Sequence, residues 1–244
     1  MKKRPHALSA VSRLATLALL ATAACHAGAQ SAGSNVLSLG WFHFGMRDSS
    51  SPLSFSQPSL GAVPGSGASV GDANTGGLSY THFFTNHFAL ALDVGAPPKF
   101  NLNGSGTLAP LGHLGSAQQW SPALVAKWFF GEANDRLRPF AGVGAAYVWY
   151  DNVTLSPSLA GEVTGGAPGG AASADLSSSW APVADLGFTY ALDKNWSIGF
   201  SVSYLPLKTD ADITGRVGDT VVSRSSTRLT LDPVVSFLSI GYRF

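Results

Sequence analysis

The last twelve residues, PVVSFLSIGYRF (233–244), decide the fold of the whole chain. Counting back from the terminus, every second side chain is large and apolar, in the order Phe244, Tyr242, Ile240 and Leu238. The side chains between them are Arg243, Gly241, Ser239 and Phe237. A period of two is typical of a β-strand with two different faces. In a chain with a secretory leader, an aromatic carboxy-terminus on such a strand indicates that the apolar row faces lipid, as in a transmembrane β-barrel.

The stretch 195–205 repeats this alternation and gives a height for the apolar band. Its apolar row consists of Trp196, Ile198, Phe200, Val202 and Tyr204. The row is aromatic at both ends, and amphipathic rings settle at the two membrane–water interfaces. The end rings are separated by about 26 Å along a strand and by roughly 20 Å in height if the strand tilts by about 40°. Trp120 and Trp128 have the same spacing, so two stretches predict the same band.

Composition and the amino-terminus indicate a secreted membrane protein. Of the 244 residues, 45% are hydrophobic and only 12% are charged, whereas about a quarter of the residues of a soluble domain are charged. A basic segment (2–4) precedes an apolar segment (14–24) that is too short to span a bilayer, and residues 27–29 form an A-x-A cleavage signal. We therefore expect residues 1–29 to be a cleaved signal peptide and residues 30–244 to form the barrel.

Removing the leader changes the cysteine content and the charge. Cys25, the only cysteine, could alternatively be a lipoprotein acylation point, although residues 22–25 lack the usual Leu three positions before the cysteine. On the signal-peptide reading, the mature chain has neither disulfide nor thiol chemistry. Four of the 15 basic residues leave with the leader, so 11 face 14 acidic ones, and we expect no nucleic-acid partner. No apolar run of eighteen residues follows the leader, which excludes a helical membrane protein.

The alternation predicts eight strands with connections that are long and short in turn. The expected strands are residues 35–46, 78–84, 87–95, 120–130, 138–150, 180–192, 195–205 and 233–244. The long connections, rich in Gly, Ser and Pro, are residues 47–77, 96–119, 151–179 and 206–227. Segment 161–175 is so rich in Gly and Ala that we expect a mobile loop there. Outer-membrane barrels have short turns in the periplasm and long loops outside, so the sequence predicts an all-β, eight-stranded antiparallel transmembrane β-barrel.

The phase of the alternation predicts which side chains face lipid and which face the lumen. The expected lipid-facing aromatic belt is Trp120, Trp128, Trp149, Tyr190, Trp196, Tyr204 and Tyr242. The expected lumen-lining side chains are Asp93, Lys127, Asp185, Ser203, Arg243, Phe83, Phe129, Phe140 and Phe237. An ionised side chain in a narrow lumen must be paired or wetted. We expect the two acids and two bases to form an ion-pair network that plugs the barrel, with a selectivity element as the alternative; the Phe rings line an apolar path or simply pack the lumen.

Five stretches of the chain resemble the OmpW family of small outer-membrane channel proteins. They are residues 81–104, 121–147, 180–190, 195–209 and 228–244, in the family's order. The resemblance implies a narrow, largely hydrophobic lumen that passes small apolar molecules and releases them sideways into the membrane. It also implies that the barrel-insertion machinery reads the aromatic end, Phe244, as an assembly signal. Family members can narrow the lumen with bulky apolar side chains, but two matching positions here are Asp93 and Ser203.

Other chemistry has little support in the residues. His82 and His87 flank the first short turn, but no carboxylate or third ligand lies nearby in sequence, so we expect no metal site. The one G-x-S-x-G match, residues 67–71, falls in a predicted Gly-, Ser- and Pro-rich loop and not in a strand–turn–helix, and we expect no enzyme. The glycine-rich segment 161–170 is not followed by Lys-Ser/Thr, as a phosphate-binding loop would require. We therefore expect no cofactor.

The sequence accordingly predicts a channel in the outer membrane of a Gram-negative cell for small hydrophobic or amphipathic molecules. The alternative is a structural barrel, or one that meets a host, phage or bacteriocin through its extracellular loops. The expected partners are outer-membrane lipid, the barrel-insertion machinery and small apolar solutes, and we expect a monomer.

Overall fold

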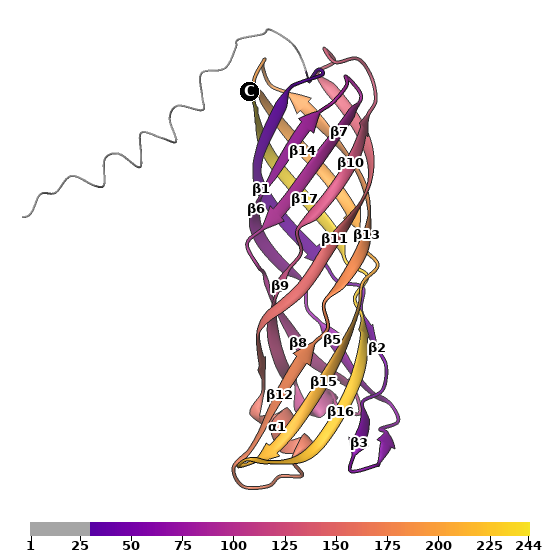
Figure 1. Cartoon of the computed structure of the whole chain (residues 1–244), viewed down its shortest axis with the longest axis vertical. Helices are drawn as coiled ribbons and strands as arrows, with labels where there is room; N and C mark the ends of the chain where they lie inside the picture. The colour runs from indigo at the N-terminus through magenta and orange to yellow at the C-terminus, as the bar shows by residue number, and fades with distance from the viewer. Residues whose placement is uncertain (1–29) are drawn as a thin grey trace, which may run out of the picture.

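The computed structural model describes residues 30–244, so the predicted signal peptide lies outside the described residues. Figure 1 shows a tall barrel whose strands run from the end that carries the carboxy-terminus to the end that carries a short helix. The three short turns lie at the carboxy-terminal end, and by the rule for outer-membrane barrels this is the periplasmic end. Within the described residues, no helix has the length and hydropathy to cross a membrane.

Eight antiparallel strands close into a barrel, as predicted. They are β1 (Asn35–Gly45), β6 (Ala73–Phe83), β7 (Phe88–Gly95), β10 (Ala123–Phe129), β11 (Leu137–Leu155), β13 (Ser179–Ala191), β14 (Trp196–Tyr204) and β17 (Val234–Arg243). Their order is β10-β7-β6-β1-β17-β14-β13-β11, and pairing of β10 with β11 closes the ring. A closed ladder satisfies the backbone N–H and C=O groups, which hydrocarbon requires of any spanning structure.

The two faces of these strands have the predicted phase. Leu39, Val143 and Ile240, in the middle of their strands, are more than half exposed on the outer face. Ala89 and Ala91, which point inward from β7, are fully buried. Large apolar side chains therefore cover the outside, while small or polar side chains leave room within.

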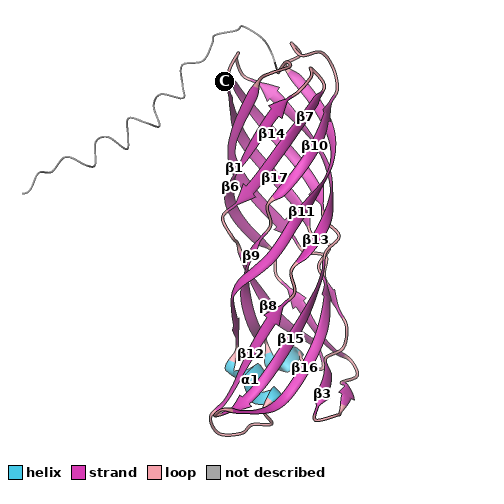
Figure 2. Cartoon of the chain, in the orientation of Figure 1, coloured by secondary structure: helices cyan, strands magenta, loops and turns pink. Residues whose placement is uncertain are grey.

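The four predicted long loops are mostly strands, which corrects the sequence reading. They contain β2 (Ser49–Ser50), β3 (Ser54–Gln57), β4 (Gly61–Ala62), β5 (Ser66–Val70), β8 (Lys99–Gly106), the 3₁₀-helix η1 (Ala109–Leu111), β9 (His113–Trp120), α1 (Pro157–Val163), β12 (Gly170–Leu176), β15 (Lys208–Val217) and β16 (Thr220–Thr230). One sheet has the order β12-β15-β16-β3-β4, and β5, β8 and β9 extend the barrel sheet from β11. Together they form the outer half of the molecule (Figure 2).

The segment that we expected to be a mobile loop, 161–175, is ordered by packing on both sides. Ser156 caps α1 by accepting a hydrogen bond from the Leu159 amide at 3.2 Å. The α1 side chains of Leu159 and Val163 are buried. The alanines of β12 pair along β15, whose Ile213 is also buried. Small side chains gave no visible alternation in this segment, so its period of two went unrecognised.

The strand predicted over 120–130 is two strands. β9 ends at Trp120 and β10 begins at Ala123, on either side of Pro122. Trp120 still belongs to the outer face, because it pairs directly with Trp149 and stacks on it with ring centroids 5.8 Å apart. The band height inferred from Trp120 and Trp128 thus rests on two strands with a break between them.

Candidate solute path through the barrel

Four cavities follow one another along the lumen, and we name them from outside to periplasm. The outer cavity has a volume of about 80 Å³, the middle cavity about 50 Å³, the inner cavity about 50 Å³ and the mouth cavity about 480 Å³. Gln119 lines both the outer and the middle cavity. The inner and mouth cavities share Gln30 and Thr189. Within residues 30–244, no residue lines both the middle and the inner cavity.

The outer cavity is an apolar pocket enclosed by the outer half. Its apolar wall comprises Met46, Val70, Phe100, Leu102, Tyr150, Val153, Leu155, Leu159, Ala174, Leu176, Ala211, Ile213, Leu229 and Leu231. Its hydroxyl groups are largely paired with one another: Tyr150 with Thr209 at 2.8 Å and Ser116 with Thr154 at 2.9 Å. Because these hydroxyl groups already have hydrogen-bond partners, the pocket offers a ligand mainly hydrocarbon surface.

A stacked aromatic pair lies between the middle and the inner cavity. The rings of Phe42 on β1 and Phe237 on β17 lie 4.0 Å apart and nearly parallel. Phe42 lines the middle cavity and Phe237 lines the inner cavity, so the pair separates the two. Phe237 was predicted to face inward, whereas Phe42 and its neighbour Phe44 were missed although they alternate with the outward Trp41.

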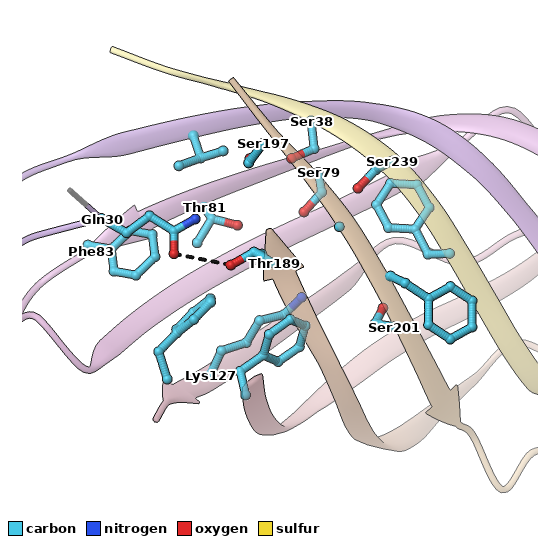
Figure 3. Close-up of a pocket in the computed structure, with 16 residues that line it drawn as sticks. Gln30, Ser38, Ser79, Thr81, Phe83, Lys127, Thr189, Ser197, Ser201 and Ser239 are labelled. Carbon is cyan, nitrogen blue, oxygen red and sulfur yellow. Dashed lines mark hydrogen bonds between the residues drawn. The ribbon is translucent and has the colours of Figure 1, made fainter. Parts of the chain in front are cut away.

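A buried ion pair lies in the same region. Lys127 Nζ lies 3.1 Å from Asp185 Oδ2, and the two side chains are 9% and 1% exposed. Ser203 donates a hydrogen bond to Asp185 Oδ1 at 2.9 Å, and Lys127 Nζ also lies 4.7 Å from the centre of the Phe140 ring. Figure 3 shows Lys127 facing a group of serines across the inner cavity. The pair binds β10 to β13 through the interior.

The predicted four-charge network is wrong in two of its members. Among residues 30–244, no basic group lies within 4.0 Å of Asp93, because Lys127 is paired with Asp185. Arg243 lies at the periplasmic mouth, where its guanidinium donates to the Lys194 carbonyl. The expectation failed because alternation fixes the face of a side chain but not its height along the barrel.

The periplasmic mouth is occupied by the first described residue. Arg138 Nη1 donates to the Gln30 carbonyl at 2.8 Å. Thr189 donates to Gln30 Oε1 at 3.2 Å, and Figure 3 shows this second hydrogen bond. Arg138 is 1% exposed, and its guanidinium carbon lies 5.9 Å and 5.2 Å from the centres of the Phe83 and Phe129 rings. Sequence reasoning missed Arg138, although it precedes the inward Phe140 by two positions. The segment at Gln30 therefore narrows the mouth.

The turn at the mouth between β13 and β14 is held by a carboxylate. Asp193 Oδ1 accepts the amides of Asn195 at 2.7 Å and Trp196 at 2.8 Å. These hydrogen bonds hold the pKa of Asp193 below its ordinary value, with a smaller contribution from Arg243. The stabilisation is present above the unfolded pKa and is lost only as the pH falls through the lowered one.

The wall of the middle cavity contains a break in the strand ladder. β7 and β10 pair as far as Asp93 and Ala123, and pairing resumes between β8 and β9 at Lys99 and Gln118. Between them, the only backbone hydrogen bond across the seam in the described chain is from the Gln119 amide to the Pro98 carbonyl, at 3.1 Å. Three prolines lie at the break, at positions 97, 98 and 122, and proline has no N–H to donate.

The break lies beside the outer aromatic belt, and residues at the break line the middle cavity. The Tyr147 amide donates to the Pro122 carbonyl, and the Tyr147 and Trp180 ring centroids are 5.0 Å apart on the outer surface. The residues at the break that line the middle cavity are Gly95, Ala96, Pro98 and Ser121. The break in the ladder therefore lies in the wall of the middle cavity, beside the outer aromatic belt.

The other predicted belt residues also face outward. Trp149 and Tyr204 lie in the outer belt with Trp120, and Trp128, Tyr190, Trp196 and Tyr242 lie near the periplasmic end. Trp196 and Tyr242 meet edge to face with centroids 5.0 Å apart. The predicted assembly residue Phe244 is exposed in line with Tyr242. These positions agree with the alternation, whereas the roles assigned to them remain predictions.

The two histidines at the first short turn have protein partners. His82 Nδ1 lies 2.8 Å from Asn35 Oδ1, and His87 Nδ1 lies 3.0 Å from the Phe129 carbonyl oxygen. Across residues 30–244, no three His, Cys, Asp or Glu side chains are grouped so that they could hold a metal ion.

Comparison with known proteins gives one family. The family model described as "OmpW family" matches residues 33–244. Outer membrane protein AlkL of Ectopseudomonas oleovorans is 28% identical over 184 residues, which are 75% of this chain and 72% of AlkL. The dibenzothiophene metabolism operon protein PahQ of Pseudomonas aeruginosa is 25% identical over 182 residues, 75% of this chain and 77% of PahQ. The crystal structure of OprG from Pseudomonas aeruginosa shares the fold, with a TM-score of 0.77, 24% identity, and coverage of 88% of this chain and 98% of OprG.

Proposed function

Because the chain belongs to the OmpW family of outer-membrane barrels, we propose that it admits small apolar or amphipathic molecules through its outer cavity and releases them sideways into the membrane. The single observation that carries the proposal is the contrast between the two halves of the lumen. On the outer side of the Phe42–Phe237 stack lies a pocket walled by hydrocarbon, and on the periplasmic side lies a polar cavity, with the Lys127–Asp185 pair at the boundary.

The contents of the lower lumen favour a side exit over an axial one. A solute that continued to the periplasm would have to part the Phe42–Phe237 stack and pass the buried Lys127–Asp185 pair. It would also leave hydrocarbon for a cavity lined by hydroxyl groups, which is unfavourable for an apolar molecule. At the ladder break, by contrast, no strand pairing needs to be broken, and the surrounding surface is apolar. The name of one relative gives further support, since dibenzothiophene is itself an apolar aromatic molecule.

Filling the outer cavity tests the proposal. Ala174 and Ala171 lie on the same strand, but Ala174 lines the outer cavity and Ala171 is exposed. We expect Ala174→Trp to reduce the uptake of dibenzothiophene by cells to the rate seen without the protein, because the ring occupies the pocket. Ala171→Trp should leave uptake unchanged. Heat-dependent migration of the folded barrel on gels shows that both variants are inserted.

The exit is tested in the same assay. Replacing both Phe42 and Phe237 with Ala removes the axial obstruction, whereas Ser121→Trp narrows the proposed side exit. Sideways release predicts that only Ser121→Trp lowers uptake. Uptake that rises when the stack is removed and ignores Ser121→Trp would instead identify an axial channel.

A further inference from the structure

The middle cavity contains two buried acceptor atoms in an apolar setting. Its apolar wall includes Phe42, Phe44, Val125, Val183, Leu205 and Val235. Asp93 Oδ1 and Gln119 Oε1 are both shielded from solvent, and neither has a hydrogen-bond partner among residues 30–244. Both residues line this cavity.

The two polar side chains that could have paired with Asp93, Ser203 and Lys127, are engaged elsewhere. In the ladder it lies between Ser79 of β6 and Ala123 of β10, and its side chain points inward. Ser203, which lines the same cavity, donates to Asp185. Lys127 is paired with Asp185 as well. Within residues 30–244, no donor lies within hydrogen-bond distance of Asp93 Oδ1.

Gln119 lies on the proposed solute path, between the outer and the middle cavity. The residue is 2% exposed and lines both the outer and the middle cavity. Its backbone amide makes the bond to the Pro98 carbonyl across the ladder break. The same residue of β9 thus provides both the unpaired side-chain oxygen and the backbone hydrogen bond across the ladder break.

A buried acceptor without a donor is unfavourable, and native structures rarely keep one unless a ligand or an ordered water satisfies it. Resting on the proposed function, we propose that the preferred solute has an apolar body with a neutral donor, a hydroxyl or N–H group, which donates a hydrogen bond to Asp93 Oδ1 or to Gln119 Oε1 in the middle cavity. Phenols, alcohols and N–H heteroaromatics belong to this class. The outer cavity holds the hydrocarbon part, and the donor is recognised immediately before the side exit.

The experiment compares two probes that differ by a single hydroxyl group. Uptake of naphthalene and of 2-naphthol is measured in cells that produce the full chain, and the binding of each probe to the purified barrel is followed by tryptophan fluorescence. We expect the wild type to prefer 2-naphthol. Asp93→Leu should lower the preference about tenfold or more in both measurements, because hydrogen bonds to charged acceptors are the strong ones. Asp212→Leu is the matched control, since Asp212 is exposed on β15 and removes a carboxylate away from the cavities.

Each outcome decides the inference. A preference that falls in Asp93→Leu but not in Asp212→Leu supports it. An unchanged preference for 2-naphthol in Asp93→Leu overturns the inference, because it would mean that water, not the solute, satisfies Asp93 in the wild type. The proposed function still stands in that case if uptake depends on Ala174. If Asp93→Leu fails to insert, Gln119→Leu takes its place, with a lower preference expected for the same reason. If wild-type cells took up neither probe faster than cells without the protein, both proposals would be overturned.

Discussion

At the scale of single residues, Gly142 makes the internal ion pair possible. Lys127 pairs in register with Gly142, Gly142 pairs with Asp185, and Asp185 pairs with Ser203, so the polar groups form one row around the wall. A Cβ atom at Gly142 would lie 2.9 Å from Val125 Cγ1 and 3.2 Å from Lys127 Cγ. Glycine therefore leaves the gap over which the lysine reaches the aspartate.

The ion pair should be costly to break from one side. Lys127→Met leaves Asp185 buried with only the Ser203 donor, and we expect a loss of about 3–5 kcal/mol in the free energy of unfolding. The double variant with Asp185→Leu should recover much of this loss, because both charges are gone. Unfolding titrations in bilayers measure the difference. Arg228→Met is the control, since the Arg228–Asp210 pair is exposed and screened by water; equal effects at the two sites would contradict the assignment.

At the scale of elements, the outward rows set the position of each strand in the membrane. Phe200 lies in the middle of β14 and Trp196 at its periplasmic end. We expect Phe200→Arg to cost about 2–4 kcal/mol and Trp196→Arg about 0–1 kcal/mol from the charge itself, because the penalty depends on depth. The ratio of the two, measured by unfolding in bilayers of fixed thickness, is the test. Equal or reversed costs would place Phe200 away from the bilayer centre.

The barrel strands were predictable because large side chains alternate with small ones, as in β14 and β17. The outer strands were not, because in β12 the alternating side chains are Gly, Ala, Ser and Asp, whose burial depends on β15 and α1 rather than on their own pattern. For the candidate site, the faces of Asp93, Lys127 and Asp185 followed from alternation. Which of them pair did not, because partners on different strands are chosen by register, and register is set only when the barrel closes.

At the scale of the whole molecule, the first and last barrel strands, β1 and β17, close the barrel together. The Phe244 amide donates to the Asn35 carbonyl at 3.0 Å, and the Asn35 amide donates to the Phe244 carbonyl at 3.2 Å. The terminal residue thus completes the seam between β1 and β17 at the periplasmic rim. Its ring also extends the outward row.

Deleting Phe244 should prevent assembly. Both seam hydrogen bonds and the terminal aromatic ring are lost, and we expect unfolded, protease-sensitive protein in the periplasm. Fractionation with protease digestion measures this. Phe84→Ala, which removes another exposed ring near the same rim, should leave most of the protein in the membrane. A normal outer-membrane yield after the deletion would show that Phe244 is dispensable.

The stacked rings of Phe42 and Phe237 also bear on what the cell can tolerate. An open pore in the outer envelope lets salts, dyes and water-soluble antibiotics leak inward in proportion to the number of copies. On the proposed sideways route, solutes do not pass the Phe42–Phe237 stack, so the stack can stay in place during transport. We therefore expect cells that overproduce this protein to be no more sensitive to hydrophilic antibiotics than cells that lack it.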